Sequence, residues 1–162
     1  MSAPEASRPR FHESYGIWAA DEGAGLLPWD WATKRLERAH NYWVASASEK
    51  GRPHAAPIWG LWLDRVFFFS TARGSRKGIN LAANPQAVVH LESGDEVVII
   101  EGAVVEVGDP KELARLAAAY GEKYTLEIDF AEAGSVVYAL RPERAFAWRE
   151  SDYPESATRF SF

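Results

Sequence analysis

The sequence predicts a mainly β fold, a small barrel of about six strands with peripheral helices. Short runs rich in Val, Ile, Phe, Tyr and Trp recur along the chain with brief turns between them, while only a few segments carry a helical period. Strands that follow one another without intervening helices favour an antiparallel barrel over a βαβ sandwich. Of the 162 residues, 47% are hydrophobic and 13% aromatic, which is enough for one domain with a substantial core.

Residues 1–27 are rich in Ala, Gly, Ser and Pro and carry no sustained period, which predicts a partly ordered N-terminal arm. Residues 28–162 are expected to form a single barrel domain. The arm contains Phe11, Tyr15 and Trp18. A free tail gains nothing from exposing three aromatic side chains, so we expect the arm to lie across the domain or its partner.

A helix is expected to begin at Asp30, a candidate N-cap, with Ala32, Leu36, Ala39 and Trp43 in line on one face. After this helix the pattern changes to strands. We expect them at residues 42–47, 55–63, 66–71, 87–92, 97–107, 136–141 and 145–149.

Turn and helix signals separate these strands. Asp64-Arg65 is a two-residue turn without the Gly that such hairpins prefer, which leaves a longer or strained turn open. Gly102 is expected to bend the longest strand. Asp109-Pro110 predicts the start of a helix over residues 111–120 that lies on the barrel. The residues after 149 are expected to form a C-terminal tail.

The turn from Thr71 to Lys77 places three cations and two hydroxyls at the start of a helix expected over residues 75–83. Free backbone N–H groups and the helix dipole favour an anion at such an end. Arg76 can grip phosphate oxygens, Lys77 supplies a compact charge, and Ser70, Thr71 and Ser75 can donate hydroxyl hydrogens. The alternative is an ordinary N-cap at Ser75 with solvated cations.

The sequence gives little support for other kinds of catalytic or binding site. The chain has no Cys, which excludes disulfides and thiolate chemistry, and its four His show no metal-ligand spacing. No nucleophile elbow, Walker loop or dinucleotide-binding Gly motif is present. A net charge of −5 argues against nucleic-acid binding. With no signal peptide or long apolar segment, we expect a soluble cytoplasmic protein that does not bind membranes.

A series of short motifs runs through most of the chain in a fixed order. They are Leu-Pro-Trp-Asp-Trp at 27–31, Asn-Tyr-Trp-Val-Ala at 41–45, Gly-Arg-Pro-His at 51–54, Pro-Ile-Trp-Gly-Leu-Trp at 57–62, Phe-Ser-Thr at 69–71, Ser-Arg-Lys at 75–77, Asn-Leu-Ala-Ala-Asn-Pro at 80–85, Glu-Ser-Gly-Asp-Glu at 92–96 and Ala-Thr-Arg-Phe-Ser-Phe at 157–162. In this order and spacing the chain resembles the flavin and deazaflavin oxidoreductases of the pyridoxamine 5'-phosphate oxidase-like split β-barrel. It resembles most the branch that uses coenzyme F420.

The resemblance implies a six-stranded split barrel and a homodimer with a cofactor groove between the subunits. Backbone of the strand after Gly-Arg-Pro-His would bind the edge of the ring, the Ser-Arg-Lys turn its phosphate end, and the partner's late strand, near Phe146 to Trp148, would approach the ring. The implied cofactor-binding residues are His54, Ala55, Ala56, Pro57, Ile58, Trp59, Ser70, Thr71, Ser75, Arg76, Lys77 and Trp148. No side chain is assigned a catalytic role, because the cofactor performs the hydride transfer.

Three tryptophans lie near one predicted sheet. Strand alternation places Trp59 and Trp62 on opposite faces. Trp59 fits the core and a cofactor site equally, whereas the core is favoured for Trp62 and Trp43.

The choice of cofactor and activity stays open at this point. The C-terminus lacks the paired arginines expected for vitamin B6 oxidation, and Arg159 alone does not replace them. The resemblance favours F420, with FMN as the alternative, and the oligoglutamate tail of F420 would need further cations. These could be Lys34, Arg35, Arg38 and Arg73, or those residues could form a solvated face.

Two functions remain. One is an F420H2- or FMN-dependent reductase of a small conjugated substrate. The other is a non-catalytic protein that binds F420 or haem, for which His54 or His90 would supply the axial ligand.

Overall fold

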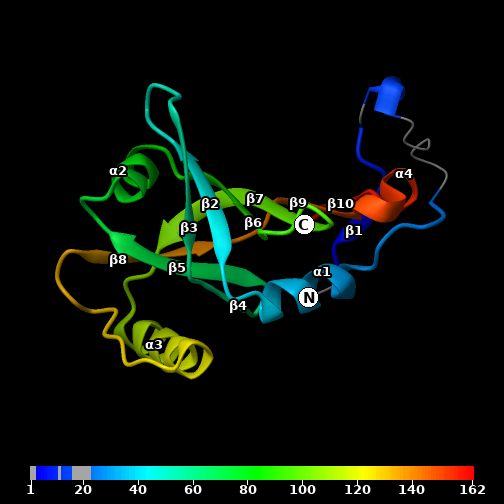
Figure 1. The fold of residues 1–162 in the computed structure, drawn as a ribbon. Coiled ribbons are helices and arrows are strands. Elements are labelled where there is room, and N and C mark those ends of the chain that lie inside the picture. The colour runs from blue at the N-terminus through cyan, green and yellow to red at the C-terminus, as the bar shows by residue number, and fades with distance from the viewer. Residues whose placement is uncertain (1–2, 11, 16–22) are drawn as a thin grey trace.

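The computed structural model describes residues 3–10, 12–15 and 23–162 (Figure 1). Its strands form one bent antiparallel sheet that does not close. The strands are β1 Glu5–Ser7, β2 Tyr42–Ala47, β3 Pro53–Ile58, β4 Leu61–Leu63, β5 Val66–Ala72, β6 Gln86–His90, β7 Glu96–Glu106, β8 Ser135–Leu140, β9 Arg144–Arg149 and β10 Thr158–Ser161. The helices are η1 Glu13–Tyr15, α1 Trp29–Arg38, α2 Arg76–Ala83, α3 Pro110–Tyr124, η2 Glu150–Asp152 and α4 Tyr153–Ser156.

The long strand β7 joins the two parts of the sheet. Its first half pairs with β9 and β6 in the order β1-β10-β9-β7-β6-β2-β3, and its last residues pair with β8, which continues to β5 and β4. The change of partner occurs around Gly102, where a Cβ atom would lie 2.3 Å from the carbonyl oxygen of Arg141. Gly102 is therefore needed for this close approach, as its predicted role in a bend requires.

The core has two parts, one on each face of β5. Phe67 and Phe69 point into the barrel, where the ring of Phe67 contacts those of Phe69 and Tyr42. Leu36 of α1, fully buried, covers one end of that interior. On the other face, Phe68 packs beneath α3, together with Leu116, Tyr120 and Val137. Figure 1 shows α3 outside the sheet below β5 and β8.

Several elements match their predicted positions. β2 has the predicted bounds, and Asp109 caps α3, which runs on to Tyr124. The Asp64-Arg65 turn is a true two-residue hairpin turn with φ of 51° and 65°, the mirror-image geometry that fits strand twist although neither residue is Gly.

Other predictions were wrong. Asp30 is not an N-cap, because α1 begins at Trp29 and Asp30 instead pairs with Lys34 at 2.6 Å. The strand predicted over 55–63 is broken between Ile58 and Leu61. Trp62 lies in the core as predicted, but Trp43 lies half-buried on the outer face of β2, because its neighbours Tyr42 and Val44 face inward.

Two short strands near the ends of the chain were not predicted. The C-terminal segment forms β10, which pairs with β9, and β1 of the arm pairs with β10. The buried guanidinium of Arg8 donates to the carbonyl of Ala157 at 3.0 Å and also to that of Glu155. Tyr15 is 60% exposed. The other two aromatic residues that were expected to pack with the arm, at positions 11 and 18, lie outside the described residues.

Candidate functional site

The turn before α2 has the structure of a capped helix start. The Ser75 hydroxyl accepts a hydrogen bond from the backbone N–H of Gly78 at 3.0 Å and lies 2.9 Å from the hydroxyl of Thr71. Gly78 is buried, and a Cβ there would lie 2.4 Å from the carbonyl oxygen of Ala72. The first turn of α2 therefore sits directly on the end of β5. Ser70 precedes Thr71 in β5 and, by strand alternation, points to the other face.

Two of the three cations in this turn have no carboxylate partner in the part of the chain that the structure describes. Arg73 donates to both carboxylate oxygens of Glu106, one of them at 3.0 Å, and so is engaged within the fold. For Arg76 and Lys77 no carboxylate partner is recorded in residues 3–10, 12–15 and 23–162. Lys77 is half-buried, and this burial lowers its pKa. A desolvated cation without a counter-charge is stabilised by an anion.

A pocket of about 310 Å³ lies beside Arg76, between α2 and the hairpin that joins β2 to β3. Its lining includes Arg52 and His54, together with Ser48, Pro53 and Asn80. Asn80 is buried and donates from Nδ2 to the Ser46 hydroxyl at 3.2 Å, which ties α2 to β2. The pocket thus brings together two guanidinium groups and an imidazole from two separate segments, the donor set that a phosphate prefers.

Sequence reasoning missed Arg52, Ser48 and Asn80 as lining residues. Arg52 was visible within the Gly-Arg-Pro-His motif. What could not be read from the sequence is that the hairpin folds over the start of α2. Asn80 lies one helical turn after Arg76, on the face that packs against β2.

β3 is an edge strand, and one hydrogen bond defines which of its backbone groups are free. The N–H of Ser48 donates to the carbonyl of Arg52 at 3.0 Å, which makes this a hydrogen-bonded pair. Antiparallel pairs alternate, so His54, Ala56 and Ile58 exchange bonds with β2, and residues 53, 55 and 57 direct their backbone groups away from it. Positions 53 and 57 are Pro, so Ala55 supplies the only N–H on this edge of β3.

The outer face of the sheet beside this edge is apolar. Across it, side by side, run Pro57 of β3, Trp43 of β2, His90 of β6, Ile99 of β7 and Phe146 of β9. All five are half-buried or exposed, and the rings of Trp43 and His90 are parallel within 3°. Trp148 lies on β9, separated from β3 by β7, β6 and β2, so its own chain does not bring Trp148 to the β3 edge.

Trp59 lies at the end of β3, 41% exposed, and stacks on Tyr124 of α3 at 4.7 Å between ring centroids. Its indole N–H donates to Oδ1 of Asn41 at 3.1 Å. The side chain therefore belongs neither to the barrel core nor to the outer face. It forms a wall at the end of β3 that is opposite to the Arg52 pocket.

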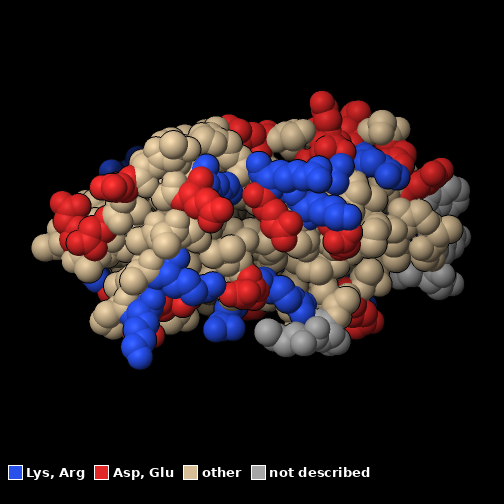
Figure 2. Space-filling view, turned by 90° about the horizontal axis from the view of Figure 1, so that it is seen from below, with Lys and Arg blue, Asp and Glu red and all other residues tan. Residues whose placement is uncertain are grey.

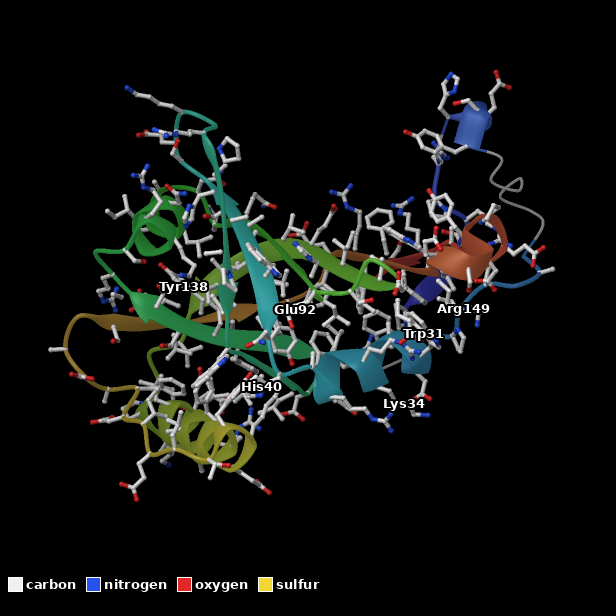
Figure 3. The ribbon with its side chains drawn as sticks, viewed as in Figure 1. Trp31, Lys34, His40, Glu92, Tyr138 and Arg149 are labelled. Carbon is white, nitrogen blue, oxygen red and sulfur yellow. The ribbon has the colours of Figure 1, made fainter. Side chains whose placement is uncertain are left out.

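The cations of α1 gather at that same far end. A pocket of about 430 Å³ is lined by Lys34, Arg35, Arg38, His40, Glu92 and Glu96, among others. Lys34 pairs with Asp30 and Arg35 with Glu96. Figure 3 shows His40, Glu92 and Lys34 near α1, away from α2, and Figure 2 shows Lys and Arg interleaved with Asp and Glu on the side where α1 and α3 lie. Most of these positive charges are therefore locally neutralised.

Within the described ranges no group of three or more His, Cys, Asp or Glu could hold a metal ion, and no helix is long and apolar enough to cross a membrane.

The site and the fold can be compared with known proteins. A family model described as pyridoxamine 5'-phosphate oxidase matches residues 30–149. The chain belongs to the pyridoxamine 5'-phosphate oxidase family. This family has a fold that binds flavin-type cofactors, and the split barrel, open between β3 and β4, agrees with it. A search of curated proteins found no match.

Several solved structures share the fold of this chain at low sequence identity. A conserved hypothetical protein from Mycobacterium tuberculosis is 23% identical, with 72% of this chain and 81% of that chain covered and a TM-score of 0.65. An F420 reductase is 24% identical, with 69% of this chain and 93% of that chain covered and a TM-score of 0.58. HutZ, a haem-storage protein from Vibrio cholerae, is 19% identical, with 73% of this chain and 89% of that chain covered and a TM-score of 0.61.

Proposed function

We propose that the protein is an F420H2-dependent oxidoreductase that transfers a hydride between the deazaflavin and a small conjugated organic substrate. The observation that carries the proposal is the set of cations around the start of α2. Arg76 and Lys77 have no carboxylate partner in the described chain, and Arg52 reaches the same pocket from another segment. A phosphate in this pocket would compensate Arg52 and Arg76, whereas Lys77 follows Arg76 in the first turn of α2 and does not line the pocket.

The backbone edge of β3 complements this pocket. The cofactor supplies the hydride chemistry when bound, and the protein binds and orients it. The N–H and C=O of Ala55, flanked by the carbonyls of Pro53 and Pro57, offer one donor between acceptors to the polar edge of a planar ring. β3 has six residues, or about 20 Å of strand, which suits a cofactor whose phosphate lies at one end and whose ring lies along the strand.

A second copy of the chain would complete the site, and we propose a homodimer. Trp43, Ile99 and Phe146 form an apolar surface next to the β3 edge. Exposed apolar surfaces of this kind are typical of protein interfaces. A two-fold partner that covers this face would bring its own β9, with Trp148, toward the ring.

F420 is favoured over FMN by the resemblance of the motifs, and one structural neighbour carries the name F420 reductase. FMN remains the alternative cofactor, because the Arg52 pocket is suited to the phosphate of either molecule.

One observation favours haem binding as a second candidate function. Nδ1 of His90 lies 2.7 Å from the carbonyl of Leu91, which fixes the proton on Nδ1 and leaves Nε2 as the atom able to ligate iron. No polar partner of Nε2 is recorded in the described part of the chain. Two structural neighbours carry haem-related titles, a haem-storage and a haem-binding protein.

Absorption spectra of the purified protein, titrated separately with F420, FMN and haem, test the proposal. We expect saturable F420 binding, abolished in an Arg52→Ala/Arg76→Ala double variant, and F420H2 oxidation with an activated enone or nitroarene. FMN that remains bound to the protein through purification would establish FMN, not F420, as the cofactor. A Soret shift that His90→Ala removes would establish haem binding, and no binding of any of the three would overturn the proposal.

A further inference from the structure

The corner between β3 and β4 is built around Gly60. This residue is buried, and a Cβ atom there would lie 2.3 Å from Cζ of Phe67, inside the barrel core. Only Gly allows the chain to turn so close to that ring. The corner breaks the strand that the sequence alone predicts and determines where Trp59 points.

The C-terminal end of α3 holds both backbone polar groups of Gly60. The hydroxyl of Tyr124 lies 2.9 Å from the N of Gly60, 2.9 Å from its O and 2.8 Å from the carbonyl oxygen of His40. With one proton, the hydroxyl accepts from the Gly60 N–H and donates to one of the two carbonyls. Nζ of Lys123 donates to the Gly60 carbonyl at 3.1 Å. We call these contacts the Gly60 clamp.

Lys123 has no carboxylate partner among the residues described. Its second contact is the hydroxyl of Tyr42 on β2, at 2.7 Å, and that hydroxyl donates in turn to the carbonyl of Leu36 on α1. The titratable groups around Lys123 are Tyr42, Tyr124, His40 before β2, and Glu37 of α1, which acts on Tyr42. Burial lowers the pKa of Lys123 to about 8.

Trp59 rests on the clamp. Its indole plane is within 8° of the ring of Tyr124, and His40 meets it edge-on. One face of the indole is thus covered by Tyr124, which also bonds Gly60, and Trp59 as a residue remains 41% exposed. A planar ring at the end of β3 would continue the stack Tyr124–Trp59.

We propose that Lys123 and Tyr124 are positioning residues that hold the Gly60 corner and thereby fix Trp59 as the platform for the cofactor ring. The proposal rests on the proposed function, because it takes the ring to lie along β3. The clamp makes the affinity for the cofactor pH-dependent. Deprotonation of Lys123 replaces a charged donor to the Gly60 carbonyl by a weaker neutral one, so binding weakens as the pH rises through about 8.

The first experiment needs no cofactor. In spectra of ¹⁵N-labelled protein between pH 6.5 and 9.5, the amide of Gly60 and the indole N–H of Trp59 should shift together with one midpoint near 8. Lys123→Met should remove this titration, Lys123→Arg should keep the low-pH signal throughout, and Tyr124→Phe should expose the Gly60 amide to exchange. Lys111→Met, on the exposed first turn of α3, is the matched control.

The second experiment measures cofactor affinity by fluorescence titration with F420 over the same pH range. We expect a loss of about three- to tenfold in Lys123→Met and Tyr124→Phe at pH 7, the effect of one weakened hydrogen bond, with Lys123→Arg close to wild type. Circular dichroism establishes that each variant is folded. Folded variants with unchanged Trp59 signals and affinity would overturn the clamp. A wild-type protein that binds neither F420 nor FMN overturns the proposed function and the link to the ring, and the spectra then decide the clamp by themselves.

Discussion

The backbone N–H of Ser48 donates to the carbonyl of Arg52 at 3.0 Å, and this bond sets the phase of the whole β2–β3 ladder. Because of that phase, the two prolines of β3 fall where no N–H is needed for the ladder. The same bond holds Arg52 at the tip of the hairpin, where its side chain meets the pocket that Arg76 also lines. The open strand edge and the cationic pocket are therefore parts of one arrangement.

Removal of single cations should weaken cofactor binding without unfolding the protein. Arg76→Ala and Lys77→Ala should each reduce affinity by about 1.5–3 kcal/mol, the value of a charge-assisted hydrogen bond. Fluorescence titration measures the loss, and the thermal midpoint should barely move. Arg73→Ala is the control, because Arg73 is exposed and paired with Glu106. Unchanged affinity in the first two variants would reduce the turn to a capped helix start.

The close contact at Gly78 should be sensitive to a single methyl group. Gly78→Ala forces a Cβ to within 2.4 Å of the Ala72 carbonyl oxygen, so α2 must shift, and we expect a loss of about 1–3 kcal/mol in stability. Gly74→Ala, with no atom beyond its two chain neighbours within 4 Å of the added carbon, should be nearly neutral. Urea denaturation of the two variants compares them, and equal stability would show that α2 adjusts freely.

The apolar outer face of the sheet, which includes Ile99, should determine whether the protein forms a dimer. We expect a dimer at micromolar concentration by sedimentation, and Ile99→Glu should produce monomers that lose cofactor affinity, because a buried unpaired charge is strongly unfavourable. Val105→Glu places the same charge at a residue that is 64% exposed on the last part of β7 and should leave the dimer intact. A wild-type monomer that binds the cofactor tightly would contradict the expectation.

How far the sequence predicts this molecule differs from element to element. The bounds of β2 and the cap at Ser75 follow from local pattern and local hydrogen bonding, which the sequence carries directly. The break at Gly60 depends on a ring of Phe67 inside the barrel and on α3, which no local pattern reveals. β1 and β10 were missed because both are short strands, of which β1 lies at the sheet edge and pairs with β10, and β10 lies between β1 and β9.

The candidate site shows the same division. Arg76 and Lys77 were predicted from a motif within one turn, and Arg76 lines the pocket, whereas Arg52 enters the pocket through tertiary folding. The cations of α1 were candidates for binding the F420 tail, with a solvated helix face as the alternative. In one chain, however, α1 ends where β2 begins and α2 packs where β2 ends, so these cations lie at the opposite end of β3 from the Arg52 pocket.

Salt dependence should separate F420 from FMN. We expect F420 to bind more tightly than FMN and to lose affinity more steeply with added salt, because an exposed acidic tail is screened over about 10 Å at 0.1 M ionic strength. Arg38→Glu should leave both slopes unchanged, since Arg38 lines a different pocket of its own chain from Arg52 and Arg76. Titrations at several salt concentrations measure the slopes. Parallel slopes would remove the basis for F420, and a flatter F420 slope in Arg38→Glu would show that α1 reaches the tail across a dimer.

Lys123 should make stability rise with pH above 8. Its folded pKa is lowered by burial from 10.5 to about 8, so between these values the unfolded chain binds more protons than the folded one. Stability therefore increases as the pH rises through that window and is lower by a constant amount below it. We expect a gain of about 1 kcal/mol, well below the full shift because the side chain is half exposed and screened.

Urea denaturation at pH 7.5 and pH 10 measures the change, and subtraction of the same change in Lys123→Met isolates this residue from the tyrosines. An identical pH dependence in the two proteins would show that the amine is not desolvated. The trend is opposite to that of cofactor affinity, because the ammonium group that strengthens the Gly60 clamp is also the group that is unfavourable to bury.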